Sequence, residues 1–262
     1  FISEIDIDKL YHLSDIKIQL DSTKRQHLLL TGKNGSGKTS LLLEIEKFLK
    51  AINDEKFSKL RGFYKDALNR AKVNIESAAS ENDKYEAEKR YRICLLYTSD
   101  AADERSSVRI TLNECDGIEK AYQDGKFIMA YFPSERKAQF DVPNGVENIE
   151  LSKAYRIDNS AGAVLLKYMV HLKTQQSYAQ NAGDESVAQM IQKWFDRFES
   201  ALRILLDEQS VHLEYDYKRY NFKICQNGRE PFGFNELSDG YSSIIYMVSD
   251  LILRMDKNWL LG

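Results

Sequence analysis

The residues best suited to chemistry form one loop, Gly32-Lys33-Asn34-Gly35-Ser36-Gly37-Lys38-Thr39. Its glycines allow backbone angles and close approaches that a Cβ atom would block, so successive peptide N–H groups can surround an anion. Lys38 adds a positive charge, and the Thr39 hydroxyl can bind a metal ion that phosphates also hold. The pattern of a glycine, four residues and Gly-Lys-Thr therefore predicts a phosphate-binding loop rather than a chance glycine-rich turn.

The segments on either side of this loop predict the elements that would position it. Leu28, Leu29 and Leu30 precede it, and the run 28–31 predicts a strand covered on both faces of a mainly parallel sheet. The apolar spacing after the loop predicts a helix over about 39–52. Such a helix would point the positive end of its dipole at the bound anion.

A second candidate anion site lies near the end of the chain, at Leu237-Ser238-Asp239-Gly240. An amphipathic helix is predicted directly after it, because apolar residues recur at helical spacing: Ile244, Ile245, Val248, Leu251, Ile252 and Met255. The N–H groups and the serine hydroxyl at the start of such a helix could bind an anion. Ser238 or Asp239 could equally be an ordinary N-cap, so the motif alone leaves both interpretations open.

The rest of the chain predicts alternating strands and helices. Strands are predicted at 5–7, 16–20, 108–112 and 127–132, and a hairpin at 211–215 and 220–224 with a turn at 227–228. A helical region is expected over 162–207, with a break at 180–184. Apolar spacing within 54–93 predicts a short antiparallel helical arm, or alternatively two surface helices packed on the sheet.

Residues 94–108 have an unusual composition. The sequence from Cys94 to Glu104 resembles, residue for residue, the translated end of a transposon-type sequencing-library adapter, and the resemblance extends to about Val108. On this interpretation the stretch was never selected to fold and Cys94 is not native, whereas the alternative is an unusual surface loop. Because the chain begins with Phe1 and stops at Gly262 in what resembles the approach to a strand, we interpret it as a fragment.

The composition favours a cytoplasmic protein without membrane association. The 262 residues are 43% hydrophobic and carry a net charge of -3, and no apolar run is long enough to cross a bilayer. The three cysteines form no Cys-x-x-Cys pair, which suits a reducing compartment. The histidines, His12, His27, His171 and His212, match no metal-ligand spacing and are expected to be structural or surface residues.

Taken together, the two loops and the helical insertion between them resemble the ATP-binding-cassette class of P-loop ATPases. Within that class the chain is similar to the SMC/RecF-like branch, often labelled AAA-type or predicted ATP-binding proteins, found in bacterial repair and phage-defence systems. The resemblance implies an α/β P-loop NTPase fold with a mixed sheet and an inserted helical arm. It divides the chain into a first core part (1–53), the arm (54–93), the adapter-like stretch (94–108) and the continued core with the signature helix (109–262).

The resemblance also implies a site for ATP and Mg²⁺. Lys38 would contact the β- and γ-phosphates, Thr39 would bind Mg²⁺, and Arg136 would be a γ-phosphate sensor unless it is simply a surface arginine. In this family the signature loop of one subunit closes over the ATP of another, so Ser238 and Gly240 would act in trans in a homodimer. The implied nucleotide-binding residues are Gly32, Asn34, Gly35, Ser36, Gly37, Lys38, Thr39, Ser40, Ser238 and Gly240.

One departure from the family pattern concerns hydrolysis. The family's next element, an apolar strand that ends in Asp-Glu, does not follow Met255 in this chain, and the histidine switch beyond it is also missing. We therefore expect this chain to bind ATP without efficient turnover. We expect the intact parent protein to hydrolyse ATP, to use hydrolysis to control its dimerisation, and to act on any effector protein.

Other functions stay open as alternatives. A GTPase is disfavoured because the guanine-reading sequence Asn-Lys-x-Asp is missing, and a small-molecule P-loop kinase would not need the helix that follows Gly240. A nucleic-acid-binding module with ATP as an allosteric regulator has support from interleaved aromatic and basic residues, although aromatic residues on alternating strand positions are more often core. These residues are Tyr215, Tyr217, Lys218, Arg219, Tyr220 and Lys223.

Overall fold

The computed structural model describes residues 1–57, 106–113, 116–133 and 138–256 of the chain. The described part is mixed α/β, which confirms that level of the predicted fold class, and its strands form two antiparallel sheets of three strands each. The chain divides into two compact units, Phe1–Phe127 and Ile128–Gly262. Residues 58–93 of the predicted arm, residues 94–105 of the adapter-like stretch, and Arg136 lie outside the described residues.

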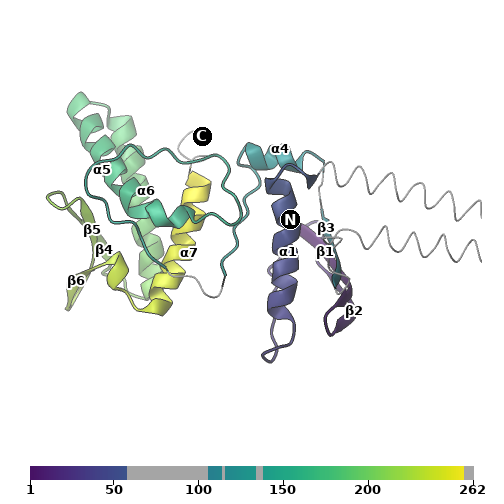
Figure 1. Ribbon diagram of the computed structural model, residues 1–262. Coiled ribbons are helices and arrows are strands. Elements are labelled where there is room, and N and C mark those ends of the chain that lie inside the picture. The colour runs from purple at the N-terminus through teal and green to yellow at the C-terminus, as the bar shows by residue number, and fades with distance from the viewer. Residues whose placement is uncertain (58–105, 114–115, 134–137, 257–262) are drawn as a thin grey trace, which may run out of the picture. The chain divides into compact units, whose positions relative to one another are not determined.

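The sheet of the first unit has the strand order β2-β1-β3 (Figure 1). Strand β1 (Ile2–Leu10) pairs antiparallel with β2 (Leu13–Gln19) on one side and with β3 (Ser106–Leu112) on the other. This arrangement confirms the strands predicted at 5–7, 16–20 and 108–112. The last three residues of the adapter-like stretch, 106–108, belong to β3 and pair with the end of β1.

The alternation of β1 gives the sheet one apolar face, against which helix α1 (Lys38–Asn53) packs. Ile5, Ile7 and Leu10 are buried there together with Leu41 of the helix. A short helix, α4 (Ile118–Gln123), lies near the other end of α1, where the Asn53 side-chain amide donates a hydrogen bond of 2.9 Å to the Tyr122 hydroxyl. The helix predicted at 39–52 is therefore confirmed and is held at both ends.

Two of the predicted strands are wrong. Residues 28–31 and 127–132 are irregular, and the Leu28 and Leu29 side chains are 39% and 83% exposed. A strand forms only where a neighbouring strand accepts and donates its backbone hydrogen bonds, and no strand among the described residues pairs with either segment. An apolar run indicates a tendency to be buried, but it does not supply the partner.

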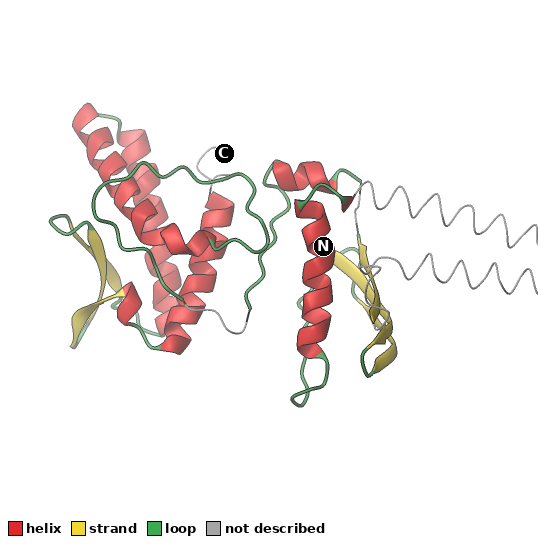
Figure 2. Ribbon diagram, viewed as in Figure 1, coloured by secondary structure: helices red, strands yellow, loops and turns green. Residues whose placement is uncertain are grey.

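The second unit packs helices on a three-stranded antiparallel sheet (Figure 2). Helices α5 (Leu165–Ala182) and α6 (Glu185–Leu206) confirm the predicted helical region and its break, which is a turn at Gly183 with φ of 75°. The N-terminus of α6 is capped by Asp184, whose carboxylate accepts a hydrogen bond of 3.1 Å from the Val187 N–H.

The sheet of this unit has the order β4-β5-β6 and confirms the predicted hairpin. Its strands are β4 (His212–Asp216), β5 (Asn221–Gln226) and β6 (Arg229–Gly233), and the 3₁₀ helices η1 (Ala161–Val164) and η2 (Phe234–Glu236) precede α5 and α7. Helix α7 (Asp239–Asp256) is the amphipathic helix predicted after the second loop. Aromatic rings fill the core between these elements, including Trp194, Phe198, Phe222 and Phe234.

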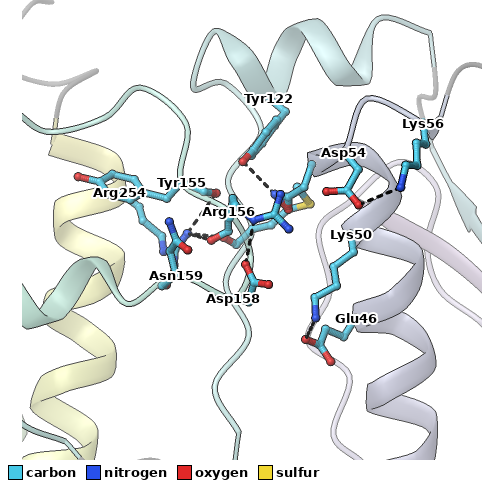
Figure 3. Close-up of polar contacts among 12 residues, drawn as sticks. Glu46, Lys50, Asp54, Lys56, Tyr122, Tyr155, Arg156, Asp158, Asn159 and Arg254 are labelled. Carbon is cyan, nitrogen blue, oxygen red and sulfur yellow. Dashed lines mark hydrogen bonds and ion pairs between the residues drawn. The ribbon is translucent and has the colours of Figure 1, made fainter.

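A buried arginine joins α7 to the long irregular segment before α5 (Figure 3). The Arg254 side chain is 2% exposed and pairs with Asp250, one turn earlier on the helix. Its guanidinium donates to the carbonyl oxygens of Met129 at 2.9 Å and Arg156 at 3.0 Å, and also to that of Asn159. Because the segment has little regular structure of its own, this one side chain supplies hydrogen-bond donors to several of its backbone carbonyl groups and fixes it to α7.

Candidate phosphate-binding site

The glycine-rich loop leads directly into helix α1, as predicted. The helix begins at Lys38, and Gly37 before it has φ of 86° and ψ of 1°, a left-handed conformation that glycine adopts without a steric penalty. The first intrahelical bond is donated by Leu41 N–H to the Gly37 carbonyl oxygen at 3.0 Å. The N–H groups of residues 38–40 precede that bond, so by the geometry of a helix they have no intrahelical acceptor and face the loop side.

Close packing explains why Gly37 has no side chain. A Cβ atom at this position would lie 2.7 Å from Leu13 Cδ1 and 3.7 Å from His12 Cε1. The β1–β2 turn and the first residue of β2 therefore rest against Gly37, the loop residue directly before α1. As a result the first sheet fixes the loop, even though the strand predicted directly before it does not form.

The Lys38 ammonium bends back over the loop. It donates hydrogen bonds of 2.8 Å to the carbonyl oxygens of Gly32 and Lys33, and one of 3.2 Å to Ser36 Oγ. These bonds hold the loop closed around the lysine and keep the positive charge at its centre. Since each acceptor is a neutral oxygen, an anion in the loop would be a stronger partner for the ammonium than any of them.

The loop forms one wall of a pocket of about 460 Å³. The residues that line it are Tyr11, His12, Asn34, Gly35, Ser36, Gly37, Lys38, Thr39 and Ser40. Most of the residues predicted for the first loop are therefore brought together around one space. Gly32 is the exception: it does not line the pocket, but its carbonyl oxygen accepts one of the bonds from Lys38.

Sequence reasoning missed Tyr11 and His12, which line this pocket from the β1–β2 turn. The turn lies more than twenty residues before Lys38, and nothing in the spacing along the chain links the two. The only signal was local: an aromatic residue and a histidine at the point where two alternating strands meet. The sequence predicts a structural or surface position for His12, and its side chain is exposed.

The second predicted loop belongs to the other compact unit and opens helix α7. Ser238, Asp239 and Gly240 are exposed, and the Ser238 carbonyl oxygen accepts a bond of 2.9 Å from the Ser242 N–H. A Cβ atom at Gly240 would meet nothing within 4 Å, so the fold of this unit does not itself require a glycine there. The predicted sensor Arg136 lies outside the described residues.

The second unit also holds a smaller, mainly apolar pocket of about 260 Å³, lined by residues that include Trp194, Phe198 and Asp256. Asp256 is 3% exposed, and its carboxylate accepts a hydrogen bond of 2.5 Å from the Tyr168 hydroxyl and another from Trp194. Burial raises the pKa of Asp256 above its ordinary value, an effect that these two bonds oppose, and burial also raises the pKa of Tyr168. The carboxylate thus ties α5, α6 and α7 together.

Within the described ranges, the structure groups no three histidine, cysteine, aspartate or glutamate side chains as a metal site. None of the helices in the described part is both long and apolar enough to span a bilayer. Compared with known proteins, the chain matches no protein-family model and, at a significant level, no curated protein sequence.

Proposed function

We propose that the chain binds ATP, with Mg²⁺, in the pocket between the loop 32–39 and the β1–β2 turn. The observation that carries the proposal is the position of the Lys38 ammonium, within one pocket with the N–H groups that start α1. Phosphate-binding loops typically combine a lysine, helix N–H groups without an intrahelical acceptor, and glycines in left-handed conformations. The volume of about 460 Å³ lies within the range of small-molecule sites.

Mg²⁺ fits this site through Thr39. The Thr39 side chain is exposed and lines the pocket, and Mg²⁺ is usually held by one or two protein oxygens together with phosphate oxygens and water. The bound ion would neutralise charge on the phosphates. The chain's own contribution would be to place the Thr39 hydroxyl, the Lys38 ammonium and the loop N–H groups around the phosphate chain.

The proposal extends to a nucleotide-dependent homodimer, as the resemblance to the SMC/RecF-like ATPases implies. In support, Ser238 and Gly240 are exposed at the start of α7, where N–H groups could meet the γ-phosphate of a partner subunit. Along α7, the side chains of Tyr241, Ile244 and Met255 are 45%, 42% and 47% exposed, so this amphipathic helix leaves some apolar side chains accessible to solvent. Hydrolysis in the intact protein, within repair or phage defence, would then release the dimer.

The test is equilibrium binding of a fluorescent ATP analogue, followed by anisotropy. Lys38→Ala removes the ammonium and should weaken binding by about 10- to 100-fold, the effect of a lost charge-assisted hydrogen bond. Lys24→Ala removes an exposed lysine that does not line the pocket and should leave the affinity unchanged. Equal affinities of the wild type and Lys38→Ala would refute the proposal. Sedimentation with and without ATP tests the dimer separately.

A second candidate function, contact with nucleic acid through the β4–β5 turn, is favoured by one observation. Tyr217 is 68% exposed, and the Lys218 ammonium lies 5.9 Å from the centre of its ring. Tyr215, by contrast, is half-buried and stacks on Phe222, with 4.8 Å between the ring centres. Salt-sensitive DNA binding that is lost in a Lys218→Ala, Arg219→Ala variant would support this candidate.

A further inference from the structure

The β1–β2 turn presents His12 to the phosphate-binding pocket. The turn comprises Tyr11 and His12, because Leu10 and Leu13 on either side of it pair across the two strands. Tyr11 has φ of 54°, a left-handed conformation that costs a residue with a Cβ atom about 1 kcal/mol or more. In the same turn, His12 Cε1 lies 3.7 Å from the position that a Cβ atom on Gly37 would take.

The pocket lining contains basic side chains but no acidic ones. Of the nine lining residues, His12 and Lys38 are the basic ones, and none of the nine is acidic. Lys38 comes from the start of α1 and His12 from the β1–β2 turn. A phosphate chain in this pocket would therefore have both an ammonium and an imidazole within its lining. An imidazole donates one N–H when neutral and two when protonated.

We propose that His12 is a phosphate-binding residue of this pocket, whose imidazole donates a hydrogen bond to the phosphate chain that the loop 32–39 holds. This inference rests on the proposed ATP-binding function and adds a contact from outside the loop. Because His12 is exposed and lies in a turn, its removal should leave the sheet intact.

Calorimetric titration of Mg²⁺-ATP and of inorganic tripolyphosphate into five forms of the chain, the wild type and the variants His12→Ala, His12→Lys, His27→Ala and Lys38→Ala, tests the inference. His12→Ala should weaken the binding of both probes about tenfold, as expected for one lost bond to a charged group. His12→Lys places another N–H donor at the same position and should bind both probes within about threefold of the wild type. The matched control, His27→Ala, removes an exposed histidine of the same unit that does not line the pocket and should change nothing.

The outcomes separate this inference from the proposed function. Wild-type affinity in His12→Ala, with a loss in Lys38→Ala, would overturn the role of His12 and leave ATP binding intact. Weaker binding of ATP with unchanged binding of tripolyphosphate would place His12 at the nucleoside and also overturn the inference. If the wild type and Lys38→Ala bind ATP equally, the proposed function itself fails. Circular dichroism of each variant establishes that the fold is retained.

Discussion

Replacing Arg254 tests how the second unit is held together. Arg254→Ala would leave Asp250 buried without its ion-pair partner, and it would remove donors from the carbonyl oxygens of Met129, Arg156 and Asn159. Breaking a buried pair by removing one partner costs about 3–5 kcal/mol. Since whole domains are stabilised by about 5–15 kcal/mol, this single change should remove a large part of the unit's stability.

Urea unfolding followed by tryptophan fluorescence measures this loss. Trp194 lies in the core of the second unit, and the sequence of the first unit, residues 1–127, contains no tryptophan, so the first unit does not contribute to the signal. Arg254→Lys keeps the charge but cannot bond to several carbonyl oxygens in a plane, and it should cost about 2 kcal/mol while the unit still folds.

The matched control is Arg219→Ala. The Arg219 side chain is 77% exposed and lies 4.0 Å from Asp216, so its loss should cost less than about 1 kcal/mol. An equal effect of Arg254→Ala and Arg219→Ala would show that the buried network does not stabilise the unit. A double variant in which Asp250 is also replaced should lose less than the sum of the two single variants, because the remaining charge is no longer buried alone.

Three further predictions concern the loop, the buried carboxylate and the start of α7. Gly35→Ala and Gly37→Ala should both cost about 1–2 kcal/mol of backbone strain, because both glycines have left-handed φ angles, 80° and 86°. Gly37→Ala should cost more and should also weaken ATP binding, because its Cβ atom would lie 2.7 Å from Leu13 Cδ1, whereas the Cβ atom at Gly35 would meet nothing; thermal melting and anisotropy measure the two effects. Burial raises the pKa of Asp256, so ionisation of this carboxyl group disfavours the folded state, and the stability of the wild type relative to Asp256→Asn should fall as the pH rises above the ordinary pKa of 3.8. Urea unfolding of both proteins from pH 3 to 7 measures this difference in stability, and a difference that stays constant with pH would contradict the prediction. Gly240→Val should leave folding intact, since the site is open, and should abolish any ATP-dependent dimer seen by sedimentation.

The sequence predicts most helices and the hairpin correctly because their patterns are local. Apolar spacing of three and four residues identifies α1, α5, α6 and α7, and the turn at Gly228 identifies the end of β5. The segments 28–31 and 127–132 are wrong because their only signal is an apolar run, and pairing depends on strands elsewhere in the chain. The six-residue helix α4 is too short to show a period.

The candidate site is predictable in part for the same reason. Residues 32–39 are adjacent in the chain, so their sequence pattern alone is enough to predict a phosphate-binding loop. His12 reaches the pocket only through the register of β1 and β2, which no local pattern reports. Arg254 likewise looks like a surface residue of an amphipathic helix, and its carbonyl partners lie about a hundred residues earlier in the chain.

Hydrogen exchange with and without Mg²⁺-ATP is the most direct test of a triphosphate held by the loop. ATP should slow exchange at the amides of residues 33–40, because the phosphate oxygens would accept hydrogen bonds from these N–H groups. It should leave exchange in the hairpin formed by β4 and β5 unchanged. The protection should disappear in Lys38→Ala. Binding of ATP that protects other segments while the amides of 33–40 exchange as before would contradict the account.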